Sequence, residues 1–441
     1  MRRDTAAQKV LDIIKCLEPC GSIIDISFPI KCSDGHQEVI RGFRAMHCSN
    51  LYNTPCLGGM RICSDLTKDH IKAFSVLSTF KHACLGIQMS GAHGGIKISG
   101  FDYDPKELKN IVVSYGKELA RRRFLGSFID VMEPDLYCGS QEMEWIAKEF
   151  SNQKDSEDKF GLACAVGKPW SAGGLQIYDK CLAHSVLYAL QLFMDDSKCM
   201  EEIGMDSGLA GKKYIIQGLG KIGSQIVLAL DKVGVKCVGI KEHDAFIYME
   251  DGIPVQDIVD YKRKNDSIQE FNKYTRTSTV DEIYMEPCDI LIFAATHRSL
   301  QCYVAENVRA KIVVEAAHAP ITPTAHKVLL ARKRLVLPDI FAGCGASVTS
   351  YLEYVKNLQH APYNALIGRL ANLSLIGSHT DFISVNDEYK IKQILESMMK
   401  KSFEEIREIT DEYKLGLDVR SAAYINGIKR IFAKIIQDKK Y

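Results

Sequence analysis

Two kinds of hydrophobic pattern alternate along the first part of the chain. Residues 23–30 (IIDISFPI) alternate between apolar and polar positions as strands do, and residues 36–47 can pair with them as a hairpin. Apolar residues recur at helical spacing in four other segments. Two of these segments open with helix-starting signals, namely the N-cap region at 65–69 and Asp104-Pro105. These helices are predicted at 5–18, 66–82, 104–122 and 141–150. The pattern predicts an α/β domain over about residues 1–165.

The pattern changes after GKPWSAGG at residues 167–174. A long helix is predicted over 176–195, and residues 212–242 then give strand, glycine turn, helix and strand in succession. Strands that alternate with helices favour a parallel sheet covered on both faces. Residues 385–441 are mostly helical with one polar face. Further apolar strands are predicted at 289–294, 311–315 and 335–337.

The composition narrows the class of protein. A chain of 441 residues is too long for one core and predicts two domains. The formal net charge of +1 gives no electrostatic reason to expect a nucleic acid or an anionic membrane as partner. No apolar run approaches the roughly 20 residues that a membrane span needs. The hydrophobic content of 46% and the charged content of 25% are ordinary for a soluble globular protein, so we expect a folded chain.

The cysteines and the N-terminal residues bear on compartment. The 15 cysteines are odd in number and contain no CxxC pair, so free thiols in a reducing compartment are expected and no metal site is. The first residues carry two arginines, but Asp4 follows and there is no cleavage region. We expect no secretory signal and see no clear mitochondrial presequence.

A glycine turn supplies the first candidate chemistry. Gly218, Gly220 and Gly223 follow a predicted strand at 214–217 and open a predicted helix. Glu242 lies 24 residues after Gly218, at the end of the next strand. This is the context of a dinucleotide-binding fingerprint, in which the pyrophosphate approaches the helix N-terminus and the acid accepts from the ribose hydroxyls. The acid favours NAD over NADP, and the alternative is a Rossmann domain that no longer binds a cofactor.

Motifs spread over nearly the whole chain resemble the glutamate dehydrogenase family, within the Glu/Leu/Phe/Val dehydrogenase superfamily. The similarity runs from about residue 8 to the end and is strongest to animal-type members. Besides the 212–244 fingerprint and GKPWSAGG, the motifs are PCLGGMR at 55–61, LSTFK at 77–81, SGAHGGIKI at 90–98, IDVMEPD at 129–135, residues 289–295, ITPTAHKVLL at 321–330, Pro338-Asp339, VTSYLE at 348–353 and LGLDVRSAAY at 415–424.

The resemblance implies a two-domain amino-acid dehydrogenase fold. Residues 1–175 would form an α/β substrate and oligomerisation domain with a mixed sheet. Residues 176–350 would form a Rossmann-type NAD-binding domain, and 351–441 a helical segment that packs back between the domains. It also implies oxidative deamination of L-glutamate to 2-oxoglutarate and ammonia with NAD(P), and a hexamer, either homomeric or shared with an active paralogue. The implied compartment is the mitochondrial matrix, with the cytoplasm as the alternative.

Some of the family's site residues are present. By resemblance, Lys81 stands at the lysine that holds the substrate α-carboxylate, and Asp135 at the proton-transferring aspartate. Ser350 matches the serine near the side-chain carboxylate, and Arg61 of the GGxR run is kept. Ala295 and the position of His318 are implied to lie in the cofactor site.

Other site residues depart from the family. His93 stands where the family has its catalytic lysine, in what we expect to be a glycine-rich loop, and Leu57 stands where a lysine pairs with the γ-carboxylate of glutamate. His318 replaces an asparagine in a turn whose two glycines are now alanines. The remaining changes are Ser78 for a methionine, Tyr178 for an arginine, Leu182 for a threonine, Ala316 and Ala319 for the two glycines, and Gly343 for an asparagine.

These changes predict weak or absent activity. A carboxylate that enters a site without the cation lost at Leu57 loses its hydration uncompensated, which costs several kcal/mol. His93 is mostly uncharged at pH 7, and losing one stabiliser of a developing negative charge slows a reaction by about two to three orders of magnitude. The leading hypothesis is an impaired, structural or regulatory protein. The alternatives are an active dehydrogenase for glutamate or an apolar amino acid, altered chemistry that uses His93, and a nucleotide-binding sensor.

Overall fold

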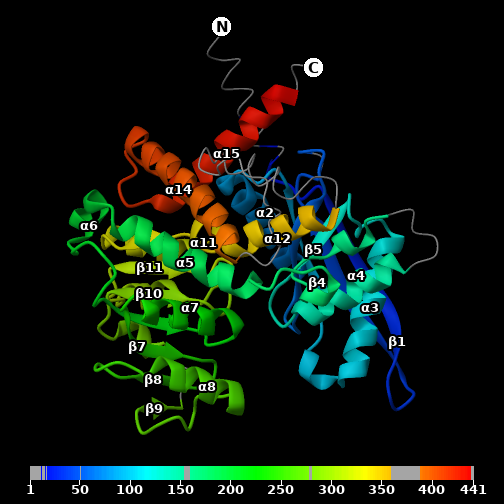
Figure 1. Cartoon of the computed structure of the whole chain (residues 1–441), viewed down its shortest axis with the longest axis horizontal. Helices are drawn as coiled ribbons and strands as arrows, with labels where there is room; N and C mark the ends of the chain where they lie inside the picture. The colour runs from blue at the N-terminus through cyan, green and yellow to red at the C-terminus, as the bar shows by residue number, and fades with distance from the viewer. Residues whose placement is uncertain are drawn as a thin grey trace. The chain divides into compact units, whose positions relative to one another are not determined.

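The computed structural model divides into two units, each built from segments that are distant in the sequence (Figure 1). The first unit holds residues 1–178, 347–391 and 427–441, and the second holds 179–346 and 392–426. The structure describes residues 11, 15, 17–49, 51–152, 159–277, 281–358 and 388–438. Most of the helix predicted at 5–18 lies outside them.

A mixed sheet forms the centre of the first unit. Its strands are β1 (Ser22–Lys31), β2 (Gln37–Met46), β3 (Cys56–Ile62), β4 (Ser90–Ile96) and β5 (Asp130–Pro134), in the order β1-β2-β4-β3-β5. The pairs β1/β2 and β2/β4 are antiparallel, whereas β3 is parallel to β4 and to β5. The predicted hairpin and the predicted mixed sheet are confirmed.

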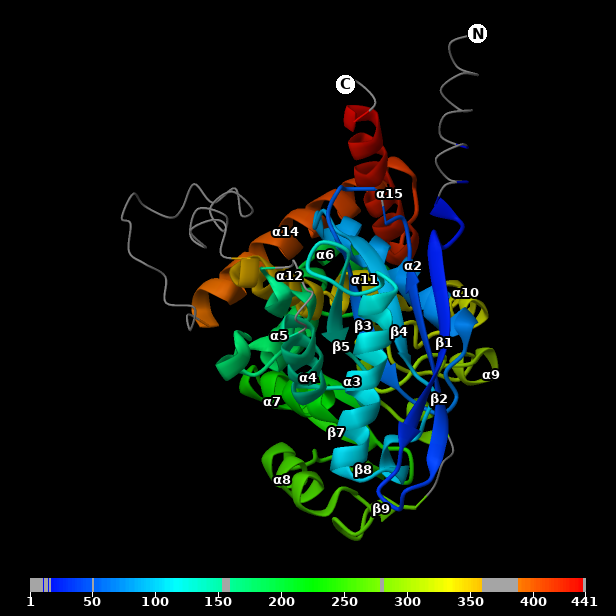
Figure 2. The same ribbon diagram turned by 90° about the vertical axis from the view of Figure 1, so that its right-hand side faces the viewer.

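The helices of the first unit begin and end where local chemistry predicts. α2 (Lys68–Leu85) has Thr67 as its N-cap and ends at Gly86, which has a φ of 79°. α3 (Pro105–Arg121) starts from a capping box between Asp104 and Glu107, with proline in its first turn. α4 (Ser140–Ser151) follows β5, and α12 (Gly345–Leu358) comes from much later in the chain. Figure 2 shows α3 beside the long strand β1, against which it packs.

The two faces of this sheet have different surroundings. Even-numbered residues of β1, β3 and β5, among them Phe28, Met60 and Met132, form one apolar core with α3 and α4. Side chains alternate along a strand, so the odd-numbered residues of β3 and β4 lie on the opposite face, which α2 covers. The functional residues predicted on β3 and β4 are odd-numbered and therefore share this second face.

A buried ion pair ties the strands of the first unit together. The Arg44 guanidinium on β2 is fully buried and donates to both carboxylate oxygens of Asp130, each at 2.7 Å. It also donates to the Gly59 carbonyl at 2.8 Å. Gly94 gives it room, because a Cβ there would lie 2.5 Å from Arg44 Cδ. A charge this deep is tolerated only when it is paired and hydrogen-bonded, as Arg44 is.

The second unit is a doubly wound α/β domain. Its sheet has the order β12-β11-β10-β6-β7-β8-β9, and the five strands from β12 to β7 are parallel. The strands are β6 (Lys213–Gln217), β7 (Lys236–Lys241), β8 (Phe246–Tyr248), β9 (Thr275–Arg276), β10 (Ile290–Phe293), β11 (Ile312–Glu315) and β12 (Leu335–Leu337). The predicted parallel sheet is confirmed. The antiparallel strands β8 and β9, of three and two residues, carry too little pattern to be predicted.

Helices flank the second sheet, and the predicted helical C-terminal region is present. They are α5 (Tyr178–Met194), α6 (Ser197–Ile203), α7 (Lys221–Lys232), α8 (Val255–Asn265), α9 (Cys302–Ala305), α10 (Pro323–Ala331), α11 (Asp339–Ala342) and α14 (Glu388–Glu412). The last helix, α15 (Val419–Asp438), belongs to the second unit up to residue 426 and to the first unit from residue 427. No helix within the described residues is long and apolar enough to cross a membrane. Packing of residues 351–441 back between the domains stays a prediction.

The stretch SGAHGGIKISG was predicted to be a loop, and this is wrong. Ser90–Ile96 is the fully buried strand β4. Its glycines serve close packing: a Cβ on Gly91 would lie 2.2 Å from the Ser75 carbonyl of α2, and one on Gly95 would lie 2.2 Å from the Arg61 carbonyl of β3. Glycine weakens a strand in general, but here it lets a helix and two strands approach the same backbone.

Candidate functional site

Five predicted site residues come together on one side of the first unit's sheet. Leu57 and Arg61 lie on β3, His93 lies on β4, and Asp135 directly follows β5. Because β3 is parallel to both neighbouring strands, these positions are adjacent across the sheet. Lys81 comes from α2, which covers this face. The structure therefore assembles in one place residues that are up to 78 positions apart in the chain (57 to 135).

Asp135 is held by two basic side chains. Arg61 Nε donates to Asp135 Oδ2 at 2.6 Å, and His93 Nε2 lies 3.0 Å from the same oxygen. The Phe74 ring packs against both partners, with its centroid 4.0 Å from the Arg61 Cζ and 5.0 Å from the His93 ring. Gly59 makes the arrangement possible, because a Cβ there would lie 2.7 Å from His93 Cε1. Asp135 Oδ2 is therefore already engaged by the protein itself.

His93 is a neutral residue in this environment. Its side chain is completely buried, and burial is the main reason that its pKa falls from 6.5 to about 4; the nearby Asp135 carboxylate acts in the opposite direction. At this site, the free energy needed to remove a charged imidazolium from water is larger than the stabilisation that one nearby carboxylate gives it. At pH 7 the ring carries no charge, so it cannot replace an ammonium group.

Lys81 keeps a charge that the protein itself does not neutralise directly. The residue is 6% exposed, and its ammonium group makes no hydrogen bond or close ion pair with any residue that the structure describes. Leu57 is fully buried and supplies only apolar surface. Ser78, one turn before Lys81 on α2, donates to the Phe74 carbonyl at 3.0 Å. An enclosed, unpaired ammonium is the arrangement expected of a binding site for an anion.

Sequence reasoning missed Glu133 on β5. It is 7% exposed and its Oε2 accepts a hydrogen bond from Ser350 Oγ at 2.7 Å, while the Tyr178 hydroxyl lies 3.0 Å from the same Ser350 oxygen. Burial raises the pKa of Glu133, against the opposing effects of Ser350 and Lys81. The available signal was a glutamate between apolar residues of the DVMEP strand, whose first four residues are buried in the structure. Ser350, expected near a substrate carboxylate, thus serves a carboxylate of the protein.

The glycine turn of the second unit has the geometry of a dinucleotide site. Gly218 has a φ of 95°, which favours glycine, and a Cβ on Gly223 would lie 1.9 Å from the Gly218 carbonyl. A Cβ on Gly220 would meet nothing within 4 Å. The first and third glycines are thus required by packing, whereas the second leaves open space at the start of α7, where a pyrophosphate binds in such folds.

The acidic residue after β7 faces this turn. Glu242 Oε1 accepts a hydrogen bond from the Leu219 amide, and Glu242 Oε2 lies 3.5 Å from Lys262 Nζ. Its side chain is 11% exposed. A carboxylate has about four acceptor positions, so these contacts leave room for ribose hydroxyls. The residues present therefore fit a dinucleotide, which would be held by the glycine turn and Glu242 and would accept or supply hydride when bound.

The other predicted cofactor residues lie at the ends of neighbouring strands. Ala295 follows β10, and a Cβ on Gly218 would lie 3.0 Å from Ala295 Cβ, so Ala295 borders the turn. His318 follows β11 and is half-buried. The next residue, Ala319, has a φ of 44°, in the left-handed region that glycine, the family's residue at this position by resemblance, adopts without steric strain. Leu182 lies buried on α5, and Gly343 directly follows α11.

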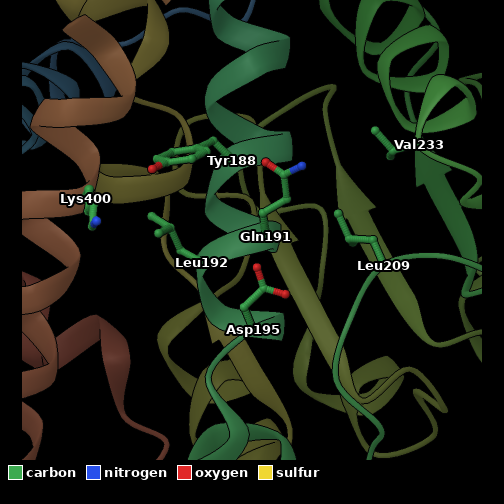
Figure 3. A pocket seen from close by; sticks show the side chains of 7 residues that line it. All are labelled: Tyr188, Gln191, Leu192, Asp195, Leu209, Val233 and Lys400. Atoms are coloured by element: carbon green, nitrogen blue, oxygen red, sulfur yellow. The ribbon is translucent and has the colours of Figure 1, made fainter. Parts of the chain in front are cut away.

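Two further features lie apart from these residues. A groove of about 390 Å³ in the second unit is lined by side chains of α5 and its end, α14 and two connecting segments (Figure 3), and no predicted site residue lines it. The groove residues are Tyr188, Gln191, Leu192, Asp195, Leu209, Val233 and Lys400.

The second feature is a group of potential metal ligands at the β1–β2 hairpin. Within the described residues, one trio, Cys32, His36 and Glu38, has potential metal-ligand atoms that all lie within 4.8 Å of one another.

Comparison with known families identifies the chain. The sequence model of the Glutamate/Leucine/Phenylalanine/Valine dehydrogenases matches residues 173–365, and that of the dimerisation domain of the same enzymes matches residues 21–152. The chain belongs to the Glu/Leu/Phe/Val dehydrogenase family. Both matches contain residues of the site, Leu57 to Asp135 in one and the glycine turn in the other.

Relatives of this member of the Glu/Leu/Phe/Val dehydrogenase family include glutamate dehydrogenases of several organisms. The mitochondrial enzyme of Dictyostelium discoideum is 28% identical over 443 residues, covering 96% of this chain and 86% of its own length. The NAD-specific enzyme of Clostridioides difficile is 30% identical over 414 residues, covering 93% and 89%. The hetero-hexameric glutamate dehydrogenase of Thermus thermophilus in its leucine-bound form has the same fold, with a TM-score of 0.81, 24% identity and coverage of 98% and 95%.

Two motifs of this family member are joined by a buried ion pair in the first unit. Lys168 of GKPWSAGG and Glu353 of VTSYLE are both fully buried, with Lys168 Nζ 2.9 Å from Glu353 Oε1. The other Glu353 oxygen accepts from the amides of Gly167, at 2.9 Å, and Leu175, at 3.2 Å. This network fixes α12, the helix that carries Ser350, against the 167–175 segment.

Proposed function

We propose that this family member is a glutamate-dehydrogenase-like protein in which the oxidative deamination of glutamate is absent or strongly impaired, and that its role is structural or regulatory. The observation that carries the proposal is the state of His93. A neutral, fully buried ring next to Asp135 occupies the position of the family's catalytic lysine. The catalytic role of that lysine is implied by the resemblance to the family. Histidine cannot take over this role because burial keeps its ring uncharged.

The chemistry of deamination requires charges that this site lacks. As hydride leaves the α-carbon and water adds to the imine, a negative charge develops on oxygen and is best stabilised by a fixed cation. His93 is uncharged, and removal of one such stabiliser costs about two to three orders of magnitude in rate. Leu57 offers no charge to the side-chain carboxylate of glutamate, and Glu133 adds a carboxyl group beside Ser350. Substrate binding and catalysis are thus both weakened.

The remaining features support a folded protein that still binds ligands. The open space at Gly220 and the position of Glu242 support retained binding of NAD, or of NADP, with no metal required. The hetero-hexameric relative supports assembly into a homo-hexamer or into a hexamer with an active paralogue. The mitochondrial relative supports location in the mitochondrial matrix, with the cytoplasm as the alternative.

One observation favours a second candidate function. Leu57 is apolar and fully buried, while Lys81 keeps an unpaired ammonium group suited to an α-carboxylate. This combination suits an active NAD(P)-dependent dehydrogenase of an apolar amino acid, or a slow one of glutamate. The neutral His93 argues against it, since hydrolysis of the imine formed from any amino acid passes through a carbinolamine and creates the same demand for a cation.

The two candidates are separated by a substrate screen. The purified full chain is incubated with glutamate and a panel of apolar amino acids, each with NAD and with NADP, and reduced nicotinamide is followed by absorbance. NADH binding, followed by nicotinamide fluorescence, serves as the control for a folded second unit. We expect no reduction with any amino acid. Rapid turnover of glutamate refutes the proposal, and turnover of an apolar amino acid establishes the alternative.

A further inference from the structure

Two buried polar groups of the first unit each keep a position without a protein partner. Glu133 Oε2 is occupied by the Ser350 hydroxyl, but Glu133 Oε1 accepts no hydrogen bond from any residue that the structure describes. The Lys81 ammonium group likewise has no hydrogen-bonding partner among these residues. Both residues are more than nine-tenths buried, and the charge of Lys81 acts on Glu133. The first unit thus contains a carboxyl oxygen, Glu133 Oε1, and an ammonium group, that of Lys81, that are both available to a ligand.

These two groups define what a ligand must offer. A buried ammonium without a partner is stabilised by an anionic ligand, and an amino acid provides an α-carboxylate for it. A buried carboxyl oxygen is stabilised by a hydrogen-bond donor and destabilised by a second carboxylate, because like charges at short range in a low-dielectric site repel strongly. A cationic side chain gains less from Glu133 than it would from an isolated carboxylate, since the positive charge of Lys81 already acts on Glu133.

We propose that this site binds an amino acid whose side chain ends in an uncharged hydrogen-bond donor, a carboxamide such as that of glutamine, and that Glu133 is the residue that rejects a side-chain carboxylate. Lys81 holds the α-carboxylate and Glu133 Oε1 accepts from the amide nitrogen. The inference rests on the proposed function in one respect: the site still binds an amino acid, although it no longer deaminates glutamate.

Protonation of Glu133 provides an internal check. Burial raises its pKa, while Ser350 on α12, Lys81 on α2 and Arg44 on β2 act in the opposite direction and Asp135 adds to the rise. A protonated Glu133 no longer repels a carboxylate. The affinity for glutamate therefore rises as the pH falls through the raised pKa of Glu133, whereas the affinity for glutamine changes little.

The test compares two ligands of nearly equal size and shape. Binding of L-glutamine and of L-glutamate to the full chain is measured by titration calorimetry from pH 8 down to pH 5, without cofactor. The proteins compared are the wild type, Glu133→Gln and Glu18→Gln, a control at an exposed glutamate of the first unit. We expect the wild type to bind glutamine at least about tenfold more tightly than glutamate at pH 8, and Glu133→Gln to lose most of this preference together with its pH dependence. The control keeps the wild-type values.

Each other outcome overturns the inference. Equal or tighter binding of glutamate by the wild type would show that Glu133 does not discriminate between the two ligands. An unchanged preference for glutamine in Glu133→Gln would show that other residues cause the preference. Binding of neither ligand would show that the first unit has no such amino-acid site. Because no turnover is measured, the result is independent of the substrate screen: a protein that deaminates glutamate yet binds glutamine more tightly refutes the proposed function and not this inference. Tryptophan fluorescence of each variant checks that the first unit is folded.

Discussion

A buried neutral histidine makes the first unit sensitive to acid. His93 lies in the centre of the candidate site with a pKa of about 4, whereas in the unfolded chain its pKa is near 6.5. Between pH 6.5 and pH 4, His93 binds a proton in the unfolded chain but stays unprotonated in the folded chain. The stabilising contribution of the neutral ring is therefore fully present above pH 6.5 and is lost as the pH falls toward 4.

The size of this effect follows from the pKa difference. One pKa unit corresponds to about 1.4 kcal/mol, so the complete loss amounts to about 3 kcal/mol, of which about 2 kcal/mol is lost by pH 5. His82 on α2 is also fully buried, and burial lowers its pKa to about 4, so it acts in the same direction. The wild-type loss is therefore larger than the share of His93, and a variant is needed to separate the two.

The two tryptophans give the assay its specificity. Trp145 and Trp170 are the only tryptophans of the chain, and both belong to the first unit. Urea unfolding followed by tryptophan fluorescence at pH 8, 6.5 and 5 therefore reports the unit that contains His93. We compare the wild type with His93→Gln, which has no group that titrates in this range, and with His36→Gln, in which an exposed histidine is replaced.

The expected result is a difference in slope. Between pH 8 and pH 5, the wild type should lose about 2 kcal/mol more unfolding free energy than His93→Gln, whatever the variant's stability at pH 8. His36→Gln should follow the wild type. The reasoning is wrong if His93→Gln loses as much stability with acid as the wild type does, because His93 would then take up a proton in the folded chain and would be available as a cation at the site.

Further predictions concern backbone strain, the glycine turn and the buried ion pair. Ala319→Gly relieves a left-handed φ of 44° and should stabilise the second unit by about 0.5–1 kcal/mol in calorimetry; no gain would show that the turn is unstrained. Gly220→Ala should keep the unfolding temperature but weaken NADH binding, whereas Gly223→Ala should cost about 1–3 kcal/mol of stability through its clash with the Gly218 carbonyl; equal effects would contradict the assigned roles. Arg44→Met leaves Asp130 buried without its cation and should cost about 3–5 kcal/mol in urea unfolding, and a loss under 1 kcal/mol would exclude an isolated charge there.

Strong local signals explain which parts of the fold were predictable. Asp104-Pro105 predicted the start of α3, and the glycine turn with Glu242 predicted the β6–α7–β7 unit. Strand β4 was misread because its glycines weaken any strand considered alone. Their benefit, the approach of α2 and β3 to the same backbone, exists only in the folded chain. A tertiary contact therefore outweighed the local preference.

The candidate site was predictable only where resemblance pointed to a position. The resemblance identified Leu57, Lys81 and His93 as site positions. It did not predict the lowered pKa of His93, nor that Lys81 would lack a hydrogen-bonding partner among the described residues. Those properties depend on burial, which is a result of packing. Glu133 was missed because it lies inside IDVMEPD, one of the motifs that carry the resemblance, and because its hydrogen bond to Ser350 joins residues 217 positions apart.

The most direct test of the central claim is a comparison of glutamate deamination by the wild type and by the triple variant Leu57→Lys, His93→Lys, Glu133→Ala. The variant restores the two cations and removes the extra carboxyl group. Production of reduced nicotinamide from glutamate is measured with NAD and with NADP under identical conditions. The account predicts no turnover by the wild type and measurable turnover by the variant. Wild-type turnover that the three changes do not increase would contradict it.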